Sequence, residues 1–390
     1  MSPSPVWARQ HLIDPEECGR CGGCEEVCPR EAISHNHFAY AINPDLCDNC
    51  DICLPECQTG AISSWRHVPA DAPYPLREQL KWDELPAQDP AWQGDAADEV
   101  PVNPVHAPRS AAQPATRLFG HHAPLIARVV ANTAVARGSS GDVHHIVIAT
   151  TPGSFPVVEG QSVGVLPPGV DEGGQPHHMR LYSMASSRDG ESAGTPTFAF
   201  TVKRVVEDYQ GQPVRGVCSN FLCDLAEGQE LGLVGPFGES FLHPDDGAPL
   251  IMIATGVGIA PMRGMIQRRS RTGTSMLGDT LFYGGRTRDQ MAYLDAFEAL
   301  SAQTGLTLEI ALSRQPDVPR RHVTDAISQN MHRLLPMLAK GNAHLYVCGV
   351  RALQTDLLNA FAIGCTAAGL DWDTLHARLT AQGRFHVETF

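Results

Sequence analysis

The sequence predicts a multidomain protein that combines α+β and α/β architecture. Two sets of four cysteines crowd the first 65 of its 390 residues. Short strand-like runs separated by turn residues begin near residue 117, and strands alternate with helical stretches from about residue 244. We therefore expect a small cysteine-rich domain, then an antiparallel β-domain, then a parallel, doubly wound α/β domain.

Changes in composition suggest the domain boundaries. We assign the cysteine-rich domain to residues 11–65 and a linker rich in proline and alanine to residues 66–116. The antiparallel domain is expected over residues 117–243 and the doubly wound domain over residues 244–390. The sequence contains neither a signal-peptide pattern nor an apolar run near the roughly 18 residues that cross a bilayer. We expect a cytoplasmic protein.

Acidic residues are concentrated at the cysteine-rich end of the chain. Residues 1–63 carry ten aspartates and glutamates against three arginines, within a net charge of −14 for the whole chain. An acidic surface disfavours nucleic acid as a partner and favours a protein with a basic docking patch. Solubility alone is the alternative explanation of the charge.

The eight N-terminal cysteines repeat one spacing, displaced by 29 residues. Three cysteines at two-residue gaps can wrap three corners of an iron–sulfur cube, and a fourth further along suits a second cube. Zinc is the alternative, but zinc sites pair separate Cys-x-x-Cys units. We therefore assign one 4Fe-4S cluster to Cys18, Cys21, Cys24 and Cys57, and a second to Cys47, Cys50, Cys53 and Cys28.

This stretch resembles the bacterial two-cluster ferredoxins, and the resemblance implies a two-cluster 4Fe-4S ferredoxin fold. One departure is visible. Pro29 follows the fourth cysteine of the first set, as is usual in that family, but Gln58 follows the fourth cysteine of the second set. We expect this change to alter the packing beside one cluster, and so its reduction potential.

Two segments in the middle of the chain suit a flavin nucleotide. In "RLYSMASS", Arg180 can bind a pyrophosphate bidentately, Tyr182 can lay its ring on the isoalloxazine, and Ser183 can reach the flavin N5 edge. In "GVCSNFLCDL", Gly216 and Ser219 open a predicted helix whose free amides can take the same pyrophosphate.

A third segment, "LIMIATGVGIAPMRG", suits a nicotinamide dinucleotide. Gly256 and Gly258 let the backbone approach a pyrophosphate, and Pro261 is favoured at the first position of the helix that follows. Further on, "ALSRQPDVPRRHV" offers Ser313, Arg314 and either Arg320 or Arg321 to an adenosine 2′-phosphate. An acidic residue beside the adenosine ribose would favour NADH. Ser313 and Arg314 offer a hydroxyl and a cation instead, so we expect NADPH to be the substrate.

From about residue 117 to its end, the chain resembles the plant-type ferredoxin–NADP reductases. The resemblance implies an antiparallel β-barrel that binds FAD and a parallel, doubly wound domain that binds NADP. The implied FAD ligands are Arg180, Tyr182, Ser183, Gly216, Val217, Cys218 and Ser219, with Lys203 near the dinucleotide phosphates. The implied NADP ligands are Thr255, Gly256, Val257, Gly258, Ser313, Arg314 and Arg321.

The resemblance also implies where hydride transfer is positioned. Cys348 and Glu388 would lie with Ser183 around the nicotinamide C4 and the flavin N5, and the terminal Phe390 would cover the flavin face that nicotinamide must occupy. His322 replaces a tyrosine usual in the family, so we expect weaker stacking on adenine.

The domain order predicts an electron route from NADPH to FAD, to two 4Fe-4S clusters, to an acceptor protein. This order is similar to that of the reductase components of benzoyl-CoA 2,3-epoxidases, a family that supplies a di-iron oxygenase in aerobic benzoate degradation. We expect such an oxygenase to dock on the acidic ferredoxin domain, and we expect no membrane partner. The alternatives are a ferredoxin–NADP reductase that serves another acceptor or produces NADPH, and a non-catalytic iron–sulfur redox sensor.

Overall fold

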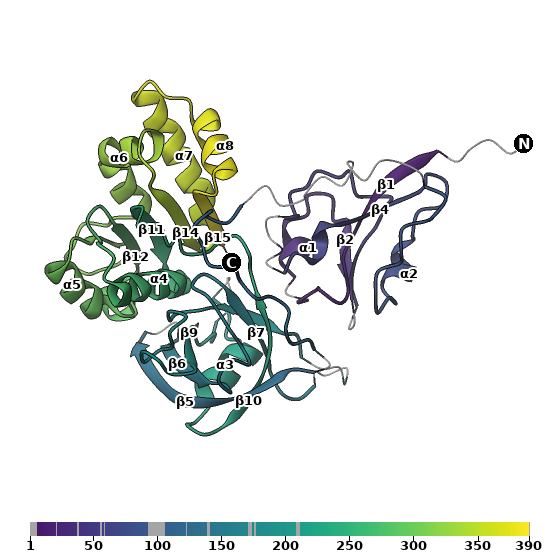
Figure 1. Cartoon of the computed structure of the whole chain (residues 1–390), viewed down its shortest axis with the longest axis horizontal. Coiled ribbons are helices and arrows are strands. Elements are labelled where there is room, and N and C mark those ends of the chain that lie inside the picture. Colours follow the sequence, from purple (N-terminus) through teal and green to yellow (C-terminus); the bar gives the residue numbers. More distant parts are fainter. Residues whose placement is uncertain are drawn as a thin grey trace, which may run out of the picture. The chain divides into compact units, whose positions relative to one another are not determined.

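The structure is a computed structural model (Figure 1). It describes residues 6–389 except residues 21, 37–38, 55–56, 58, 93–105, 122, 139–140, 171–173, 175–176 and 208–210. The chain divides into two compact units, each described by itself below. The first unit is Met1–Pro104 with Pro168–Leu181, and the second is Val105–Pro167 with Tyr182–Phe390. Within the described residues, none of the helices has the length and apolar character needed to span a membrane.

The first unit is built from two short antiparallel strand pairs. Strand β1 (Trp7–Leu12) pairs with β4 (Ser64–Pro69), and β2 (Ile33–His35) pairs with β3 (Tyr40–Ile42). Its described part also contains the one-turn helices α1 (Gly23–Val27) and α2 (Leu76–Gln79) and the 3-10 turn η2 (Ala61–Ser63). Buried isoleucines from both cysteine repeats share one core with Cys18, Cys24 and Cys53, and these isoleucines are Ile13, Ile33, Ile42 and Ile62.

The folded part of the first unit continues past residue 65, where we expected a linker to begin. The buried Gln79 amide donates to the carbonyls of Ile42 and Tyr74, at 2.8 Å each. The rings of His67 and Trp92 stack with centroids 4.0 Å apart. The predicted boundary at residue 65 thus falls inside this unit. The segment lacks helical or strand periodicity because side-chain bonds to backbone, rather than long regular elements, hold much of it in place.

Apart from Arg180 and Leu181, which belong to the first unit, the second unit contains a six-stranded antiparallel sheet in the order β8-β7-β10-β5-β6-β9. The strands are β5 (Leu125–Ala136), β6 (Val143–Ala149), β7 (Ser162–Leu166), β8 (Arg180–Ser183), β9 (Thr197–Lys203) and β10 (Glu230–Phe237). An isolated bridge joins Met184, next to β8, to Phe200 in β9, so the two edge strands meet at one point. Helix α3 (Val217–Asp224) packs against β9 and β6.

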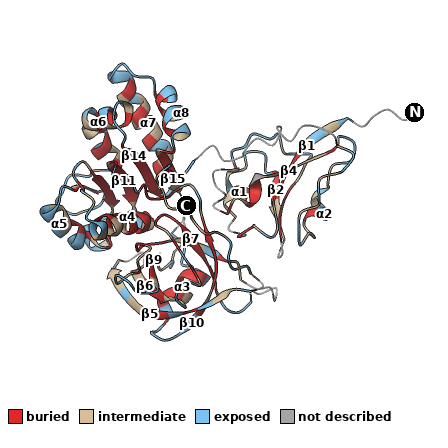
Figure 2. Ribbon diagram, in the orientation of Figure 1, coloured by how far each residue is buried: buried red, intermediate tan, exposed pale blue. Residues whose placement is uncertain are grey.

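The rest of the second unit is a parallel five-stranded sheet in the order β13-β12-β11-β14-β15. Its strands are β11 (Leu250–Thr255), β12 (Thr280–Gly285), β13 (Thr307–Leu312), β14 (His344–Gly349) and β15 (Phe385–Thr389). Its helices are α4 (Ile259–Thr272), α5 (Leu294–Gln303), α6 (Val323–Ala339), α7 (Arg351–Ala367) and α8 (Trp372–Ala381). The strands are mostly buried, and the helices expose their outer faces (Figure 2). The order reverses at β11, which opens a crevice at the carboxyl ends of the strands.

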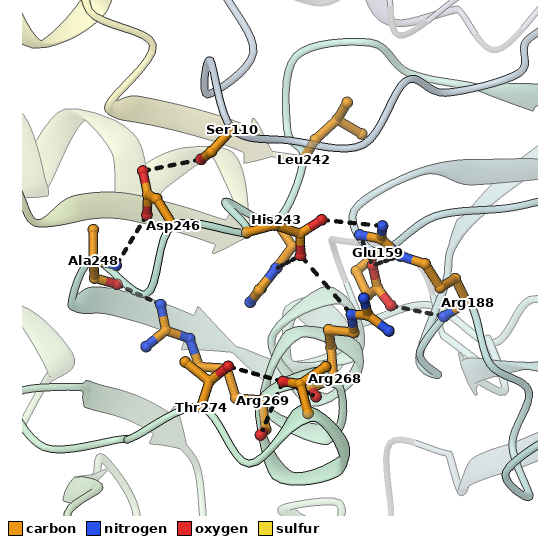
Figure 3. A network of polar contacts seen from close by, with 12 residues as sticks. Ser110, Glu159, Arg188, Leu242, His243, Asp246, Ala248, Arg268, Arg269 and Thr274 are labelled. Atoms are coloured by element: carbon orange, nitrogen blue, oxygen red, sulfur yellow. Dashed lines mark hydrogen bonds and ion pairs between the residues drawn. The ribbon is translucent and has the colours of Figure 1, made fainter.

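A polar network lies where the two sheets of the second unit meet (Figure 3). Arg188 pairs with the fully buried carboxylate of Glu159 at 2.6 Å and with Asp245 at 3.1 Å. Asp246 accepts hydrogen bonds from Ser110 and from the amide of Ala248, both at 2.9 Å. These contacts fasten the segment between β10 and β11 to both sheets.

One buried ion pair ties α4 to the start of the parallel sheet. Arg269 and Asp279 are both fully buried and lie 3.0 Å apart. Asp279 also accepts the amide of Leu250 at 2.8 Å, and Arg269 donates to the carbonyl of Ala248. The pair therefore connects three elements, α4, β11 and β12, at the end of the sheet opposite the crevice.

We expect Asp279→Ala to lower the free energy of unfolding by about 3–5 kcal/mol, because it leaves a buried guanidinium without its carboxylate. The measurement is chemical denaturation followed by circular dichroism. Asp189→Ala is the matched control, since Asp189 pairs with Arg268 at a site where its side chain is 41% exposed. That substitution should lower the free energy of unfolding by no more than about 1 kcal/mol. Equal losses in the two variants would contradict the role given to the buried pair.

Candidate functional site

The described cysteines of the two repeats line two separate cavities. Cys18 and Cys24 share the first cavity with Cys57 from the second repeat. The second cavity is lined by Cys47, Cys50 and Cys53 together with Cys28 from the first repeat. This is the crossed grouping that the sequence predicts. Cys21, the remaining expected ligand, lies outside the described residues.

The donor set of each cavity suits an iron–sulfur cluster. Thiolates are the ligands that 4Fe-4S clusters take in proteins, and the second cavity presents four of them. The two cavities differ in exposure, since Cys18 and Cys24 are buried whereas Cys50 is exposed. A centre bound in the second cavity would therefore lie nearer to solvent.

The residues expected to bind FAD occupy a strand and a helix. Arg180 begins β8, is exposed and donates to the carbonyl of Met179 at 3.0 Å. Tyr182 and Ser183 follow on the same strand and are half-buried. Tyr182 lies against Phe200, with ring centroids 5.8 Å apart. The strand thus presents a cation, a ring and a hydroxyl in the predicted order.

Helix α3 begins one residue after Gly216, as expected. A Cβ atom at Gly216 would lie 2.8 Å from both Ser219 Oγ and Val205 Cβ, so only glycine fits there without displacing a neighbour. The Cys218 thiol is buried against the carbonyl of Val165, and Val217 is 49% exposed. The amides of the first turn have no partner inside the helix, which is the arrangement that binds a pyrophosphate.

Ser183, Cys348 and Glu388 are brought together in the second unit. Ser183 Oγ donates to Glu388 Oε2 at 3.4 Å. Cys348 and Glu388 are directly paired across β14 and β15, so their side chains share a face of the sheet. Phe390, which we expected beside them, lies outside the described residues.

Burial disfavours charge on both acidic side chains of this group. Burial raises the pKa of Glu388 to about 8, and the Ser183 hydroxyl opposes that rise only in part. Burial also raises the pKa of the Cys348 thiol well above its usual range, and the neighbouring Glu388 adds to the effect. A pocket with a neutral acid and a neutral thiol can be covered by an aromatic ring without burying a charge.

The expected nicotinamide segment forms a tight turn at the crevice. The turn Gly256–Gly258 joins β11 to α4. A Cβ at Gly258 would collide with the carbonyl oxygen of Cys348, so this position requires glycine. Helix α4 begins at Ile259, two residues earlier than the start we expected at Pro261. Pro261 still lies in the first turn, where its missing N–H leaves no helical bond unmade.

A cavity of about 540 Å³ opens beside this turn, a size typical of sites for small ligands. Its lining includes six of the residues that we expected at the dinucleotide, namely Lys203, Thr255, Gly256, Val257, Ser313 and Arg321. His322 also lines the cavity, whereas Gly258 and Arg314 are outside its lining.

The two arginines expected at the 2′-phosphate differ in their surroundings. Arg321 is engaged by Glu309 at 3.2 Å and by Gln329 at 2.8 Å. Arg314 is exposed, and its amide donates to the carbonyl of Arg286 at 2.8 Å. Arg314 is therefore the more available of the two side chains.

Sequence reasoning missed two cations that line the same cavity, Arg286 and Arg137. Arg286 directly follows β12, after Gly284 and Gly285. A signal was present, because ligands of parallel α/β sheets bind at the carboxyl ends of the strands. Arg137 follows the long strand β5 of the other sheet, and nothing in its sequence context points to this cavity.

Comparisons with known proteins agree with this architecture. The family model "Oxidoreductase NAD-binding domain" matches residues 252–358, and the model "4Fe-4S binding domain" matches residues 11–34 and again 40–63. The cyanelle ferredoxin–NADP reductase of Cyanophora paradoxa is 34% identical over 285 residues, which cover 70% of this chain and 78% of that protein. The ferredoxin–NADP reductase of Synechocystis sp. is 31% identical over 308 residues, covering 75% of this chain and 71% of that protein.

A solved structure supports the fold of the same region. Ferredoxin-NADP+ reductase from Plasmodium falciparum with 2'P-AMP covers 70% of this chain and 99% of its own, at 22% identity and a TM-score of 0.55. The antiparallel sheet followed by the parallel sheet is thus the arrangement of that reductase.

The crossed grouping of cysteines predicts a pattern of non-additive losses. If Cys24 and Cys57 serve one cluster, Cys24→Ala and Cys57→Ala each lose about half of the iron, and the double variant loses no more. Cys24→Ala combined with Cys28→Ala should instead lose nearly all iron. The measurement is the iron content of purified protein, with electron paramagnetic resonance of the reduced samples. Complete iron loss in the Cys24→Ala, Cys57→Ala variant would contradict the grouping.

The raised pKa of Glu388 predicts a pH-dependent stability. Between the ordinary value of 4.5 and about 8, the folded protein keeps a proton that the unfolded chain releases. The contribution of Glu388 to stability therefore falls as pH rises through this range. The glutamine of Glu388→Gln cannot titrate. The unfolding temperature of this variant, relative to that of the unsubstituted protein, should therefore rise between pH 5 and pH 8. The exposed Glu227→Gln is the control, and a difference that stays constant with pH would contradict the assignment.

Proposed function

Because the chain belongs to the ferredoxin–NADP reductase family, we propose that it takes electrons from NADPH and passes them through its cysteine-rich domain to an acceptor protein. Family membership makes the chain an NAD(P)-dependent flavin oxidoreductase. The observation that carries the proposal is the presence of two 4Fe-4S matches and the reductase region in one polypeptide. The electron-accepting module that a separate ferredoxin would provide is here part of the enzyme.

We assign FAD to the strand β8 and the helix α3. When bound there, FAD would supply the conversion between the two-electron chemistry of NADPH and the single-electron chemistry of iron–sulfur centres. Arg180 and the first-turn amides of α3 bind the pyrophosphate, and Tyr182 stacks on the isoalloxazine. Support comes from the glycine-only space at Gly216 and from the outward position of Arg180. The family resemblance implies that Phe390, which lies outside the described residues, would cover the opposite face of the ring.

Ser183, Cys348 and Glu388 position the nicotinamide ring. This role is supported by the 3.4 Å contact between Ser183 and Glu388 and by the strand register that pairs Glu388 with Cys348. The raised pKa values of both acidic groups keep the pocket neutral, so a flat aromatic ring enters without desolvating a charge.

The proposed substrate is NADPH rather than NADH. Ser313 and Arg314 bind the adenosine 2′-phosphate, together with Arg320 or Arg321. Support comes from the position of Ser313 in the cavity lining and from the exposure of Arg314, which follows it directly, and of Arg320 further along the same loop. The absence of an acidic side chain in the sequence from Ser313 to Gln315 agrees with this preference.

The proposed acceptor is a di-iron oxygenase, and the specific candidate is benzoyl-CoA 2,3-epoxidase. The order of the domains supports this assignment, since it is the order of the reductase components that serve that oxygenase. We propose that electrons leave the protein from the second cysteine cavity. Support comes from the exposure of Cys50, which lies among the exposed carboxylates of Asp45, Asp48 and Asp51. A basic surface on the acceptor would be attracted to this region. The names of the relatives favour a second candidate, a ferredoxin–NADP reductase that serves another acceptor or forms NADPH.

Loss of both clusters should separate the two halves of the reaction. We expect the unsubstituted holoprotein to oxidise NADPH with ferricyanide and also to reduce the oxygenase. The variant Cys24→Ala, Cys28→Ala should keep the ferricyanide reaction, which needs only the flavin half, and lose reduction of the oxygenase. Stopped-flow absorbance measures both reactions. Equal oxygenase reduction by the two proteins would contradict an exit through the cysteine-rich domain.

The oxygenase for this assay comes from affinity capture on the holoprotein in extracts of benzoate-grown cells. The specific assignment expects a captured di-iron protein that turns over benzoyl-CoA only when NADPH and this chain are both present. Turnover of a different substrate would retain the reductase function and exclude the benzoyl-CoA assignment.

A further inference from the structure

Arg286 lies at the mouth of the crevice, beside the turn that starts α4. In the parallel pairing of β11 and β12, Thr255 is directly opposite Gly284. Arg286 is two residues past Gly284, and Thr255 is the last residue before the turn Gly256–Gly258. Two strand ends that share this register bring the side chain of Arg286 and the free amides of the turn to the same cavity.

Lys203 approaches the same place from the other sheet. It ends β9, which packs against the turn Gly256–Gly258, and it lines the same cavity as Arg286. Burial lowers the pKa of Lys203, and the positive charge of Arg286 lowers it further. The ammonium group of Lys203 and the guanidinium of Arg286 therefore repel each other across the cavity. An anion bound between them would relieve that repulsion.

The partner that Arg286 has in the structure is weak. Glu207 lies 4.0 Å from its guanidinium, and the two side chains are 45% and 39% exposed. An ion pair of this length and exposure contributes little to stability and exchanges readily. Arg321 differs, because Glu309, Gln329 and the carbonyl of Ile310 already hold its guanidinium. The planar guanidinium of Arg286 is thus available to bind a phosphate bidentately.

We propose that Arg286 binds the pyrophosphate of the nicotinamide dinucleotide, beside Lys203, which the family resemblance already implies near the dinucleotide phosphates. This contact would be the same for NADPH and for NADH. The inference rests on the proposed function and adds a ligand that sequence reasoning did not supply. The pyrophosphate is favoured over the 2′-phosphate because both cations converge on the turn that begins α4, where helix amides also point at the ligand. The 2′-phosphate subsite remains with Ser313 and Arg314.

Kinetics with both nicotinamide nucleotides test the assignment. Because NADPH and NADH share the pyrophosphate, Arg286→Ala should raise KM for both by the same factor, about tenfold for the loss of a charge-assisted contact, with kcat little changed. Arg286→Lys should recover part of the affinity. The matched control is Arg314→Ala, which should raise KM for NADPH alone. A rise confined to NADPH in Arg286→Ala would overturn the proposal, and so would no rise with either nucleotide.

Equilibrium binding gives a test that does not depend on turnover. We expect Arg286→Ala to weaken the binding of ADP, which has a pyrophosphate, in isothermal titration of the FAD-loaded protein. Adenosine 2′-monophosphate, which has no pyrophosphate, should bind the variant and the unsubstituted protein equally. Unchanged ADP affinity would overturn the role of Arg286. Failure of the unsubstituted protein to oxidise NADPH while these ADP results hold would instead overturn the proposed function.

Discussion

The close approach of the turn Gly256–Gly258 to the end of β14 is the constraint on which the reductase half depends. Gly258 lies against the carbonyl of Cys348, and no side chain larger than hydrogen fits between them. This contact fixes the start of α4 relative to β14. Since β15 is in register with β14, it also fixes Glu388 relative to the same turn. One backbone approach therefore sets the positions of both the crevice at Gly256–Gly258 and Glu388, the partner of Ser183.

Two electrostatic regimes lie within the second unit. At the ends of β14 and β15, burial raises the pKa values of Cys348 and Glu388 and removes charge. The large cavity instead gathers cations from both sheets, and Arg137, Lys203, Arg286 and Arg321 all line it. The first regime suits an uncharged ring and the second suits phosphates, and a nicotinamide dinucleotide carries both kinds of group. The difference in charge between the two places would orient such a ligand, if it binds as proposed.

Much of this organisation was predictable from the sequence, because the informative residues form local patterns. The cysteine spacing predicted the grouping that places Cys57 with the first repeat and Cys28 with the second. The strand, glycine turn and proline predicted the crevice at Gly256. What the sequence did not reveal depends on contacts between distant residues. The place of Arg286 after β12 was a sequence signal, but its position beside the turn Gly256–Gly258 depends on the register of β12 against β11. The ion pair of Arg321 with Glu309 is seen only in the fold.

The crossed cysteines explain why the first unit must fold as one piece. Its described core is small and draws isoleucines from both repeats, so neither repeat encloses a core of its own. Each cavity also takes one cysteine from the opposite repeat, so neither repeat alone supplies a complete set of ligands. Filling either cavity with a cluster would therefore link the repeats covalently, and cluster assembly and folding would be coupled in the same way as in small metal-dependent domains. If both cavities hold clusters, this exchange would keep the two centres in one folded unit, which a simple tandem of independent cluster domains would not do.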